Sequence, residues 1–391
     1  MTGDIGSVVV KSRASGVGSP LVGTLAVELP TPALLVDLDR LEANLSRWQG
    51  ALDEAGVRFR PHVKTHKIPD IAVRQIELGA CGIVAAKVSE AEVFVAAGIH
   101  DIVIAFPVLG TDKWERAARI AASGASLSVN IDNGVGARGL SAAATANGAR
   151  IGVQLEVDTG LHRVGVAPGD VAQLASLARL VESLPGLDLE GVTTYRGAAF
   201  QHTAAMTLAE AGLDEGQALV QVAEELRREG IPVREVTAGS TPTGRAVATV
   251  PGVTEVRAGT YAFNDLMQLG LGAAGPDDLA LSVLTTVVSR HGDHATVDGG
   301  SKAFAGDSPA SVAGASGKAF ARSVDGNIVI DRLSEEHGMI SAGAEALAAG
   351  DKVAWYPSHV CTCVNLSDEL YGIRAGRVER VWEVAARGRR V

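Results

Sequence analysis

The sequence predicts an α/β protein in which a closed (β/α)8 barrel is joined to a mainly antiparallel β domain. From residue 57 to residue 258, eight short apolar segments alternate with helical segments. Strict alternation implies a parallel sheet with right-handed crossovers, and eight such units suit a closed barrel. After Phe263 the segments become short, rich in valine and bounded by turns, as is typical of antiparallel strands.

The chain before the barrel is expected to contain three kinds of segment. Residues 1–20 are rich in Ser, Gly and Val and lack the apolar run of a signal peptide, so we expect a loose arm. Residues 21–27 are expected to add a strand to the β domain. Residues 33–37 form a short apolar strand, and residues 38–55 follow with apolar positions at helical spacing.

The elements of the two domains follow from the same patterns. The barrel strands are expected at residues 57–60, 82–86, 102–106, 127–130, 151–157, 189–195, 235–238 and 255–258. The helices between them are expected at residues 68–78, 89–97, 113–123, 134–147, 168–184, 208–229 and 243–250. The β-domain strands are expected at residues 280–290, 294–298, 326–331, 352–356 and 377–384. The predicted domains are therefore 31–265 for the barrel, and 21–30 with 266–391 for the β domain.

An open doubly wound sheet is the alternative to the closed barrel. Such a sheet usually has a glycine-rich phosphate turn after its first strand, whereas the first strand here is followed by the lysine segment at residues 60–67.

Composition and charge disfavour several classes of function. The net charge of −10 argues against a nucleic acid or an anionic membrane as the main partner. No apolar run reaches the roughly 18–20 residues that span a bilayer. Three cysteines are too few for a disulfide framework, so we expect a cytoplasmic protein.

The candidate catalytic residue is Lys64, within the segment Arg-Pro-His-Val-Lys-Thr-His-Lys at residues 60–67. Two imidazoles and two further cations surround it. Like-charge repulsion lowers the pKa of such a lysine and favours the free amine, which attacks aldehydes. The alternative is a basic surface loop at the end of a strand.

A phosphate site is expected on the same rim of the barrel as Lys64. The loops at residues 239–243 and 259–261 follow the seventh and eighth strands. These two loops often bind phosphate in such barrels, although an ordinary capped turn is the alternative. A lysine and a phosphate site together predict pyridoxal phosphate, an aldehyde that acts as an electron sink.

Two further groups follow the fifth and sixth strands. Arg163 is placed to bind the ring oxygen of the cofactor or to hold Lys64, and an ion pair with Asp158 is the alternative. Tyr195 is placed to stack on the cofactor or donate to it, and a half-buried core tyrosine is the alternative.

A candidate metal site lies far along the chain. His359 and Cys361 are two residues apart, so on an extended chain their side chains share one face. Imidazole and thiolate suit Zn²⁺, and only two protein ligands leave positions open, as in Lewis-acid sites. A buried cysteine beside a hydrogen-bonded histidine is the alternative.

Five blocks of the sequence resemble the D-threonine aldolase and D-serine dehydratase family, which has the bacterial alanine racemase fold type. They are residues 60–67, 158–165, 239–243, 257–265 and 357–361. The resemblance extends from about residue 31 to the C-terminus.

This resemblance implies roles for individual residues. It implies that Lys64 binds pyridoxal phosphate covalently and that Tyr195 and Arg163 contact the cofactor. It implies a divalent metal at His359 and Cys361, with Zn²⁺ favoured over Mn²⁺ or Mg²⁺. The phosphate ligands that it implies are Gly239, Ser240, Thr241, Gly259 and Tyr261. It also implies a homodimer in which the β domain of one subunit helps cover the barrel of the other.

The expected activity is a lyase reaction on small 3-hydroxy-D-amino acids. The primary prediction is a D-threonine aldolase, which releases glycine and an aldehyde. Residues 195–202 and 381–388 are similar to aldolases, and His202 is the candidate base because Arg196 stands where aldolases often carry histidine.

Other activities remain alternatives. A D-serine or D-3-hydroxyaspartate dehydratase would release a 2-oxo acid and ammonia, and the His-x-Cys pattern is similar to dehydratases. An amino-acid racemase is more remote, because it would pair Lys64 with a tyrosine and need neither His359 nor Cys361. A non-catalytic pyridoxal phosphate carrier and a cofactor-free binding protein complete the list.

Overall fold

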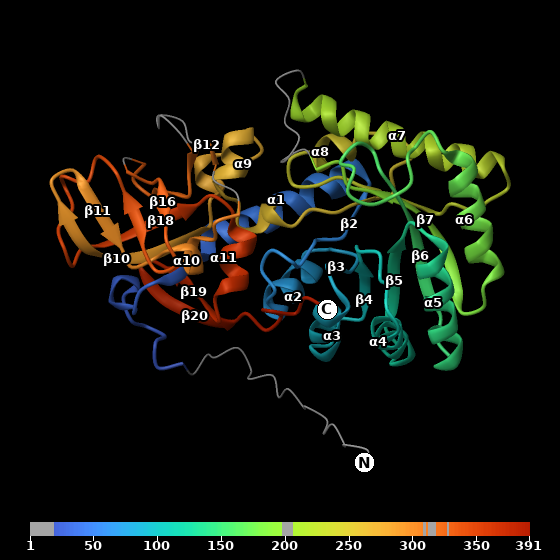
Figure 1. Cartoon of the computed structure of the whole chain (residues 1–391), viewed down its shortest axis with the longest axis horizontal. Coiled ribbons are helices and arrows are strands. Elements are labelled where there is room, and N and C mark those ends of the chain that lie inside the picture. The colour runs from blue at the N-terminus through green and yellow to red at the C-terminus, as the bar shows by residue number, and fades with distance from the viewer. Residues whose placement is uncertain (1–18, 198–205, 308–309, 312–317, 327) are drawn as a thin grey trace, which may run out of the picture.

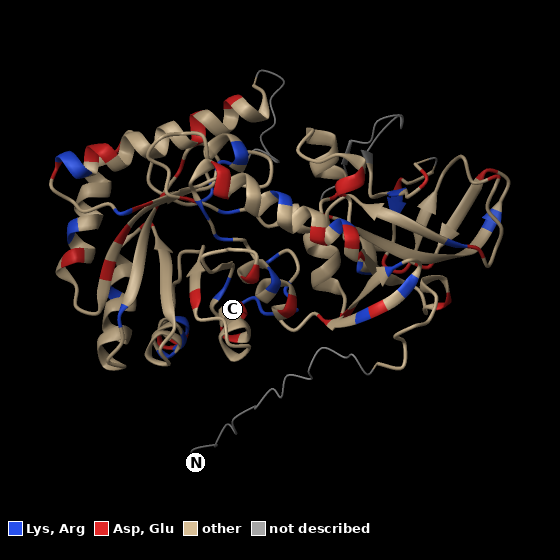
Figure 2. Ribbon diagram, turned by 180° about the vertical axis from the view of Figure 1, so that it is seen from behind, with Lys and Arg blue, Asp and Glu red and all other residues tan. Residues whose placement is uncertain are grey.

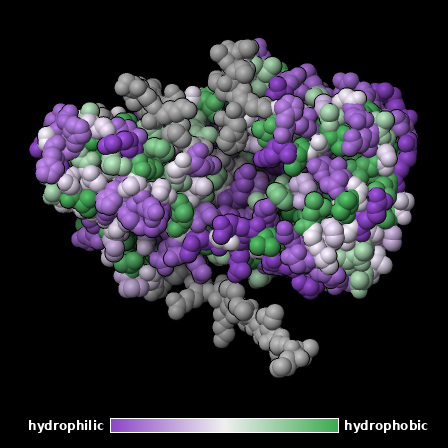
Figure 3. Space-filling view, viewed as in Figure 1, coloured by the Kyte–Doolittle hydropathy of each residue, from purple (hydrophilic) through white to green (hydrophobic). Residues whose placement is uncertain are grey.

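The computed structural model describes residues 19–197, 206–307, 310–311, 318–326 and 328–391. Figure 1 shows these residues in two lobes, one built around a parallel sheet and the other around an antiparallel sheet. Hydrophilic residues surround the hollow between the lobes in Figure 3. Within the described residues, no helix has the length and apolar character needed to cross a bilayer.

The first lobe is the predicted barrel. Its eight strands pair in parallel in the order β2-β9-β8-β7-β6-β5-β4-β3. They are β2 (Arg58–Phe59), β3 (Ile83–Ala85), β4 (Asp101–Ile104), β5 (Ser126–Ile131), β6 (Ile151–Val157), β7 (Leu187–Thr194), β8 (Glu235–Ala238) and β9 (Glu255–Val256). A parallel bridge between His62 and Val84 joins the two ends of this sheet just beyond β2. The expectation of an eight-stranded barrel is confirmed.

Helices cover the outside of the barrel (Figure 1). Those between the strands are α2 (Pro69–Glu77), α3 (Val88–Ala96), α4 (Thr111–Ala122), α5 (Gly134–Ala146), α6 (Val171–Ser183), α7 (Leu208–Arg228) and α8 (Gly244–Val247). Helix α1 (Leu38–Ala55) precedes them, and Asp37 caps its N-terminus through two backbone N–H groups. Acidic and basic residues are interspersed along these helices in Figure 2.

The inside of the barrel is polar rather than filled with branched apolar side chains. At the end where the strands begin, Arg60 contacts both Glu255 (2.9 Å) and Asp101 (2.5 Å). At the other end, Arg257 lies 3.9 Å from Glu156. Arg60, Glu255, Arg257 and Glu156 are each buried, so these charges are compensated inside the protein rather than by bulk water.

The second lobe contains a ten-stranded sheet whose main path is β15-β14-β18-β10-β1-β19-β20. Its members are β1 (Ala33–Asp37), β10 (Leu281–His291), β11 (His294–Val297), β14 (Ala321–Ser323), β15 (Val329–Ile330), β16 (Arg332–Leu333), β17 (Gly338–Ile340), β18 (Lys352–Pro357), β19 (Glu369–Arg374) and β20 (Arg377–Glu383). A separate pair is formed by β12 (Ala310–Ser311) and β13 (Lys318–Ala319). All pairings in the larger sheet are antiparallel except that between β1 and β19.

The N-terminal part of this lobe differs from the sequence-based expectation. Strand β1, which the sequence grouped with the barrel, pairs with β10 and β19 in the second sheet. Ala33, Leu34 and Val36 are buried and lie on both faces of the strand, so its sequence pattern does not indicate which sheet it joins. Residues 21–27 form no strand, because Leu25 makes a single bridge to Arg377 and a 3-10 turn (Ala26–Glu28) follows.

Candidate active site

Lys64 lies just beyond the C-terminal end of β2, as predicted. The backbone around it is held from two sides, since His62 N donates to Ala258 O (2.8 Å) and Val63 N donates to Val84 O (2.9 Å). The backbone N of Lys64 donates to His62 Nδ1 (3.4 Å). Hydrogen bonds to the strand ends on either side therefore fix the lysine segment at the mouth of the barrel.

Burial lowers the pKa of Lys64, and the cations Arg163 and Arg257 lower it further against the attraction of Cys361. Repulsion by Arg60 and Lys67 is the cause expected from the sequence. Arg60 is instead paired with acidic groups inside the barrel, and Lys67 is paired with the buried Glu90 (2.6 Å). The direction of the pKa shift agrees with the expectation, but its main cause is desolvation.

The two histidines of the lysine segment are neutral groups in the structure. Burial lowers the pKa of His62 well below its ordinary value, and Lys64 and Arg257 act in the same direction. Burial also lowers the pKa of His66 to about 3. His66 Nε2 lies 3.3 Å from Gln75 Oε1, so His66 is tied to the barrel wall rather than to the metal site.

Tyr195 lies close to two cations. The Lys64 Nζ atom is 5.8 Å from the centroid of the Tyr195 ring, and the Arg163 guanidinium carbon is 4.9 Å from it. Burial raises the pKa of Tyr195 to about 12, so its hydroxyl keeps its proton and remains a donor. The structure thus brings together the lysine, the arginine and the tyrosine that the sequence singled out.

The alternative ion pair between Asp158 and Arg163 does not form. Asp158 Oδ2 instead lies 3.1 Å from His162 Nδ1, and Asp158 Oδ1 accepts from the backbone N of Gly160 (3.0 Å) and His162 (2.9 Å). Asp158 therefore shapes the turn after β6, and Arg163 projects beyond it toward Tyr195.

The hydroxyl groups of the candidate phosphate loop after β8 form a small network. Ser240 Oγ lies 3.0 Å from Thr243 Oγ1, and the backbone N of Tyr261 donates to Thr241 Oγ1 (3.0 Å). Gly239 has a φ of 89°, and a Cβ there would lie 2.9 Å from Gly244 Cα. The loop after β8 and the loop after β9 are therefore joined at the barrel mouth.

A buried carboxylate that the sequence argument missed organises this loop. Glu215 on α7 accepts from Thr243 Oγ1 (2.8 Å), Gly239 N (3.1 Å) and Arg196 N (3.3 Å). Burial raises the pKa of Glu215. The role of Glu215 could not be predicted from the sequence, because it is one of several acidic residues in a long helix.

The other two candidate phosphate ligands lie close to this loop. Tyr261 packs its ring against Trp48 and Phe59, and its hydroxyl accepts from Gln75 Nε2 (2.7 Å). Its side chain therefore fills the barrel wall, while its N–H faces Thr241. Gly259 lies against the lysine segment, where a Cβ would be 2.7 Å from His62 O.

Arg257 is a second residue to which the sequence argument gave no role, although it follows the last barrel strand. It is 6 % exposed and donates through Nη2 to Thr194 O (2.8 Å). Its Nη1 atom has no hydrogen-bond partner among the described residues. An orphaned buried donor next to a lysine, a tyrosine and a hydroxyl-lined loop fits a flat anionic aldehyde such as pyridoxal phosphate.

The candidate metal ligands belong to helix α11 (Val360–Leu366) and its N-terminal cap. The prediction of an extended chain here is wrong. His359 keeps extended backbone angles (φ −138°, ψ 109°) as the cap, whereas Cys361 lies in the first helical turn. The two side chains nevertheless interact, and the Cys361 sulfur lies 3.3 Å from Thr65 Oγ1, next to Lys64.

Charges around this pair favour a thiolate. Burial alone would raise the pKa of Cys361, but His359 and Lys64 outweigh it and the pKa is lowered. Among the described residues, no third His, Cys, Asp or Glu completes a metal-binding cluster with them. An imidazole beside a thiolate, with open positions, fits a borderline-soft ion such as Zn²⁺ in a Lewis-acid site.

Two carboxylates support the first turn of α11. Asp307 Oδ2 lies 2.8 Å from His359 Nδ1. Asp265 accepts from the backbone N of Val360 (3.1 Å) and Gln268 (2.9 Å), and burial raises its pKa to about 6. Neither aspartate was recognised in the sequence, because the contacts of both with α11 span dozens of residues.

His202, the candidate base, lies outside the described residues.

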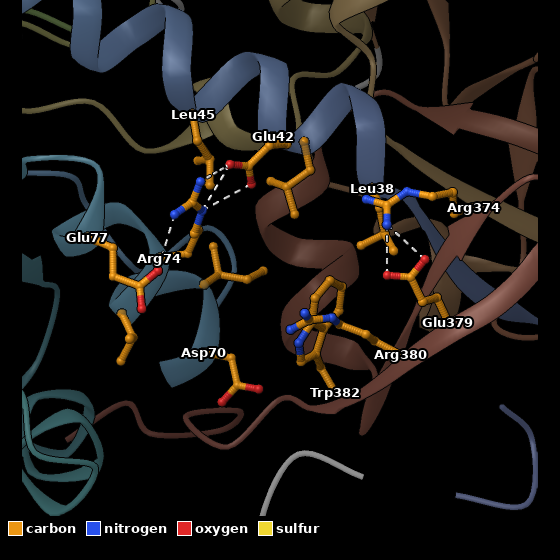
Figure 4. Close-up of a pocket in the computed structure, with 13 residues that line it drawn as sticks. Leu38, Glu42, Leu45, Asp70, Arg74, Glu77, Arg374, Glu379, Arg380 and Trp382 are labelled. Atoms are coloured by element: carbon orange, nitrogen blue, oxygen red, sulfur yellow. Dashed lines mark hydrogen bonds and ion pairs between the residues drawn. The ribbon is translucent and has the colours of Figure 1, made fainter. Parts of the chain in front are cut away.

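A cavity of about 420 Å³ elsewhere is lined by α1, α2, β19 and β20 (Figure 4). None of the candidate residues lines it, and its Arg74 is paired with Glu42 and Glu77. We therefore place the chemistry at the barrel mouth and not in this cavity.

The barrel, the buried lysine at its mouth and the polar loops around it define a pyridoxal phosphate-dependent enzyme of the alanine racemase fold. Residues 36–266 match the family described as alanine racemase, N-terminal domain, and residues 280–373 match the putative serine dehydratase domain. The chain belongs to this alanine-racemase-like family, which includes D-threonine aldolase and D-threo-3-hydroxyaspartate dehydratase.

Individual relatives cover nearly the whole chain. A D-threonine aldolase from Arthrobacter sp. is 36% identical, over 95% of this chain and 95% of its own. The D-threo-3-hydroxyaspartate dehydratase of Delftia sp. (strain HT23) is 34% identical, over 91% of this chain and 97% of its own. The crystal structure of D-threonine aldolase from Filomicrobium marinum has a TM-score of 0.84 at 33% identity, covering 94% of this chain and 98% of that chain. A cysteine-to-alanine mutant of D-threo-3-hydroxyaspartate dehydratase, solved in a metal-free form, has a TM-score of 0.83 at 32% identity, over 92% of this chain and 98% of that one.

Proposed function

We propose that the protein is a pyridoxal phosphate- and divalent-metal-dependent lyase of 3-hydroxy-D-amino acids, with D-threonine aldolase activity as its main reaction. The observation that carries this proposal is the 3.3 Å contact between Cys361 and Thr65, the neighbour of Lys64. It joins a metal-ligand pair to the lysine segment, so an ion held by that pair and a substrate bound beside Lys64 would share one site. The relatives named D-threonine aldolase support the same activity.

The cofactor, when bound, delocalises the negative charge that develops at the substrate Cα atom. Lys64 provides the amine that holds the cofactor, and burial, which lowers its pKa, favours the nucleophilic free amine. Tyr195 and Arg163 orient the ring of the cofactor. The phosphate ligands in this proposal remain Gly239, Ser240, Thr241, Gly259 and Tyr261.

His359 and Cys361 would hold the divalent metal, which supplies Lewis acidity that lowers the pKa of a hydroxyl group. We propose Zn²⁺, because a thiolate is a soft ligand, with Mn²⁺ and Mg²⁺ as alternatives. The metal-free form of a relative that lacks one cysteine supports a cysteine ligand in this family.

Aldol cleavage needs a base for the β-hydroxyl proton, and His202 stays our proposal for it. Arg196 is not suited to this role, because a guanidinium only donates hydrogen bonds and this one is paired with Asp214. Cleavage of the Cα–Cβ bond would then release an aldehyde, and protonation of Cα would give glycine.

A dehydratase reaction is the second candidate, and the thiolate ligand Cys361 favours it. The dehydratase relative that was solved metal-free lacks a cysteine. In that reaction Lys64, as a free amine, removes the Cα proton and hydroxide leaves from Cβ. D-serine or D-3-hydroxyaspartate would be the substrate.

A racemase is less well supported. It needs a tyrosine from the C-terminal domain as a second acid or base beside Lys64. Of the two tyrosines there, Tyr356 accepts from Arg40 (2.9 Å) and Tyr371 donates to Glu369 (3.3 Å).

By resemblance to the family we further propose a homodimer located in the cytoplasm.

One experiment distinguishes these activities. The protein loaded with pyridoxal phosphate and Zn²⁺ is incubated separately with D-threonine, D-serine and D-3-hydroxyaspartate, and the products are identified. Glycine with an aldehyde supports the aldolase, and ammonia with a 2-oxo acid supports the dehydratase. Lys64→Ala should abolish both. Formation of only the L-enantiomer, unaffected by a chelator, would contradict the proposal and indicate a racemase.

A further inference from the structure

Asp307 follows the short helix α10 (Ser301–Phe304) and reaches across to the first turn of α11. Both of its carboxylate oxygens are used there. Oδ2 lies 2.8 Å from His359 Nδ1, and Oδ1 accepts from Thr362 Oγ1 (2.9 Å). The carboxylate therefore bridges the cap of the helix and its third residue.

When His359 binds a metal as a neutral imidazole, the contact with Asp307 determines which of its two nitrogens keeps the proton. An ionised carboxylate only accepts hydrogen bonds, so Nδ1 must be the protonated nitrogen. A neutral imidazole then has its lone pair on Nε2, which is the atom left for a metal. The Thr362 hydroxyl lies 3.3 Å from His359 Nδ1 but 2.9 Å from Asp307, so it braces the carboxylate.

Asp265, the other carboxylate near the start of helix α11, does not contact the imidazole of His359 through a hydrogen bond. Asp265 is 1 % exposed and its oxygens accept from the backbone N of Gln268 and Val360. It holds the start of helix α11, whereas Asp307 contacts the imidazole itself.

We propose that Asp307 is the positioning residue of the metal centre, fixing His359 so that its Nε2 atom and the Cys361 sulfur face one ion. Carboxylates that orient metal-bound histidines raise the basicity of the ligand, and their loss typically costs 10- to 100-fold in metal affinity. This inference rests on the proposed metal-dependent function, and it adds a residue to that site.

The test uses the full chain, loaded with pyridoxal phosphate and stripped of metal, and measures Zn²⁺ affinity by competition with a chelator. Asp307→Ala should weaken binding about 100-fold and Asp307→Asn about 10-fold, because the amide oxygen still accepts from Nδ1. Thr362→Val should weaken it only a few-fold. In the Co²⁺-loaded protein, the absorption band that arises from the bond between Co²⁺ and the Cys361 thiolate should shift in Asp307→Ala relative to the wild type.

A matched aspartate–histidine pair in the same lobe provides the control. Asp293 lies 2.6 Å from His294 Nδ1, and both side chains are exposed. Asp293→Ala should bind Zn²⁺ like the wild type. The visible band of bound pyridoxal phosphate reports whether each variant keeps its fold.

The outcomes separate this inference from the proposed function. If the wild type and His359→Ala bind Zn²⁺ equally, the metal site itself is wrong. If His359→Ala loses Zn²⁺ while Asp307→Ala and Asp307→Asn bind it like the wild type, the metal site stands and the role of Asp307 is overturned.

Discussion

The Cys361 sulfur lies 3.3 Å from the Thr65 hydroxyl, which links helix α11 of the β domain to the residue that follows Lys64. Thr65 is fully buried, so bulk water does not compete for the hydrogen bond between Thr65 and Cys361. A thiolate sulfur would accept the proton of the Thr65 hydroxyl, and this contact is one of the causes that lower the pKa of Cys361. The metal pair and the lysine segment are thereby positioned as one unit, although they come from opposite ends of the chain.

Thr65→Val should therefore weaken Zn²⁺ binding about tenfold. A hydrogen bond to a charged group contributes about 1.5–3 kcal/mol, and about 1.4 kcal/mol corresponds to a factor of ten. Chelator competition measures the change, and Thr65→Ser, which keeps the hydroxyl, should behave like the wild type. Equal affinities in Thr65→Val and the wild type would mean that the contact contributes nothing to metal binding.

Gly259→Ala should displace the lysine segment. The added Cβ would lie 2.7 Å from His62 O and 2.8 Å from Thr65 Oγ1, and both atoms flank Lys64. A displacement of about 1 Å at a catalytic group costs roughly 100-fold in rate, so we expect that loss in kcat and a weaker visible band of bound cofactor. Gly50→Ala is the control, because a Cβ there meets no atom within 4 Å. A Gly259→Ala variant with wild-type kcat would contradict the placement.

The barrel was predictable because its signal is local. Apolar segments of strand length alternate with segments of helical periodicity, and each can be read without knowing its partners. Strand β1 shows the limit of this reading. Its apolar residues identify a strand, but only its pairing with β10 and β19 shows that it belongs to the second sheet.

The candidate site was predictable where chemistry is concentrated in short motifs, as around Lys64 and at His359 and Cys361. The supporting residues were not predictable, because they act over long separations. Glu215 accepts from Thr243 across 28 positions of the chain, and Asp307 contacts His359 across 52. The metal pair was predicted from an extended chain, whereas the helix cap is what brings its members together.

Glu215→Ala should weaken the binding of pyridoxal phosphate more than that of pyridoxal, which lacks the phosphate. The substitution leaves the Thr243 hydroxyl and the backbone N of Gly239 and Arg196 without their acceptor, at about 1–3 kcal/mol each when buried. We expect at least tenfold weaker binding of the phosphorylated form in absorbance titrations. Glu215→Gln keeps one oxygen acceptor and should lose less. An unchanged preference for the phosphorylated form would show that Glu215 does not organise the phosphate loop.

His66 should make the protein sensitive to acid. Burial lowers its pKa from 6.5 to about 3, so between these values the unfolded chain binds a proton that the folded chain does not. Stability therefore decreases as the pH falls below 6.5, by about 2 kcal/mol at pH 5, since one pKa unit corresponds to about 1.4 kcal/mol. His66→Asn keeps an acceptor for Ile68 N and does not titrate, so its free energy of unfolding should fall by about 2 kcal/mol less than that of the wild type between pH 7 and pH 5. His100→Asn, at an exposed position, is the control for replacing a histidine by asparagine. Identical pH dependence in the wild type and His66→Asn would show that this imidazole is not the source of the acid sensitivity.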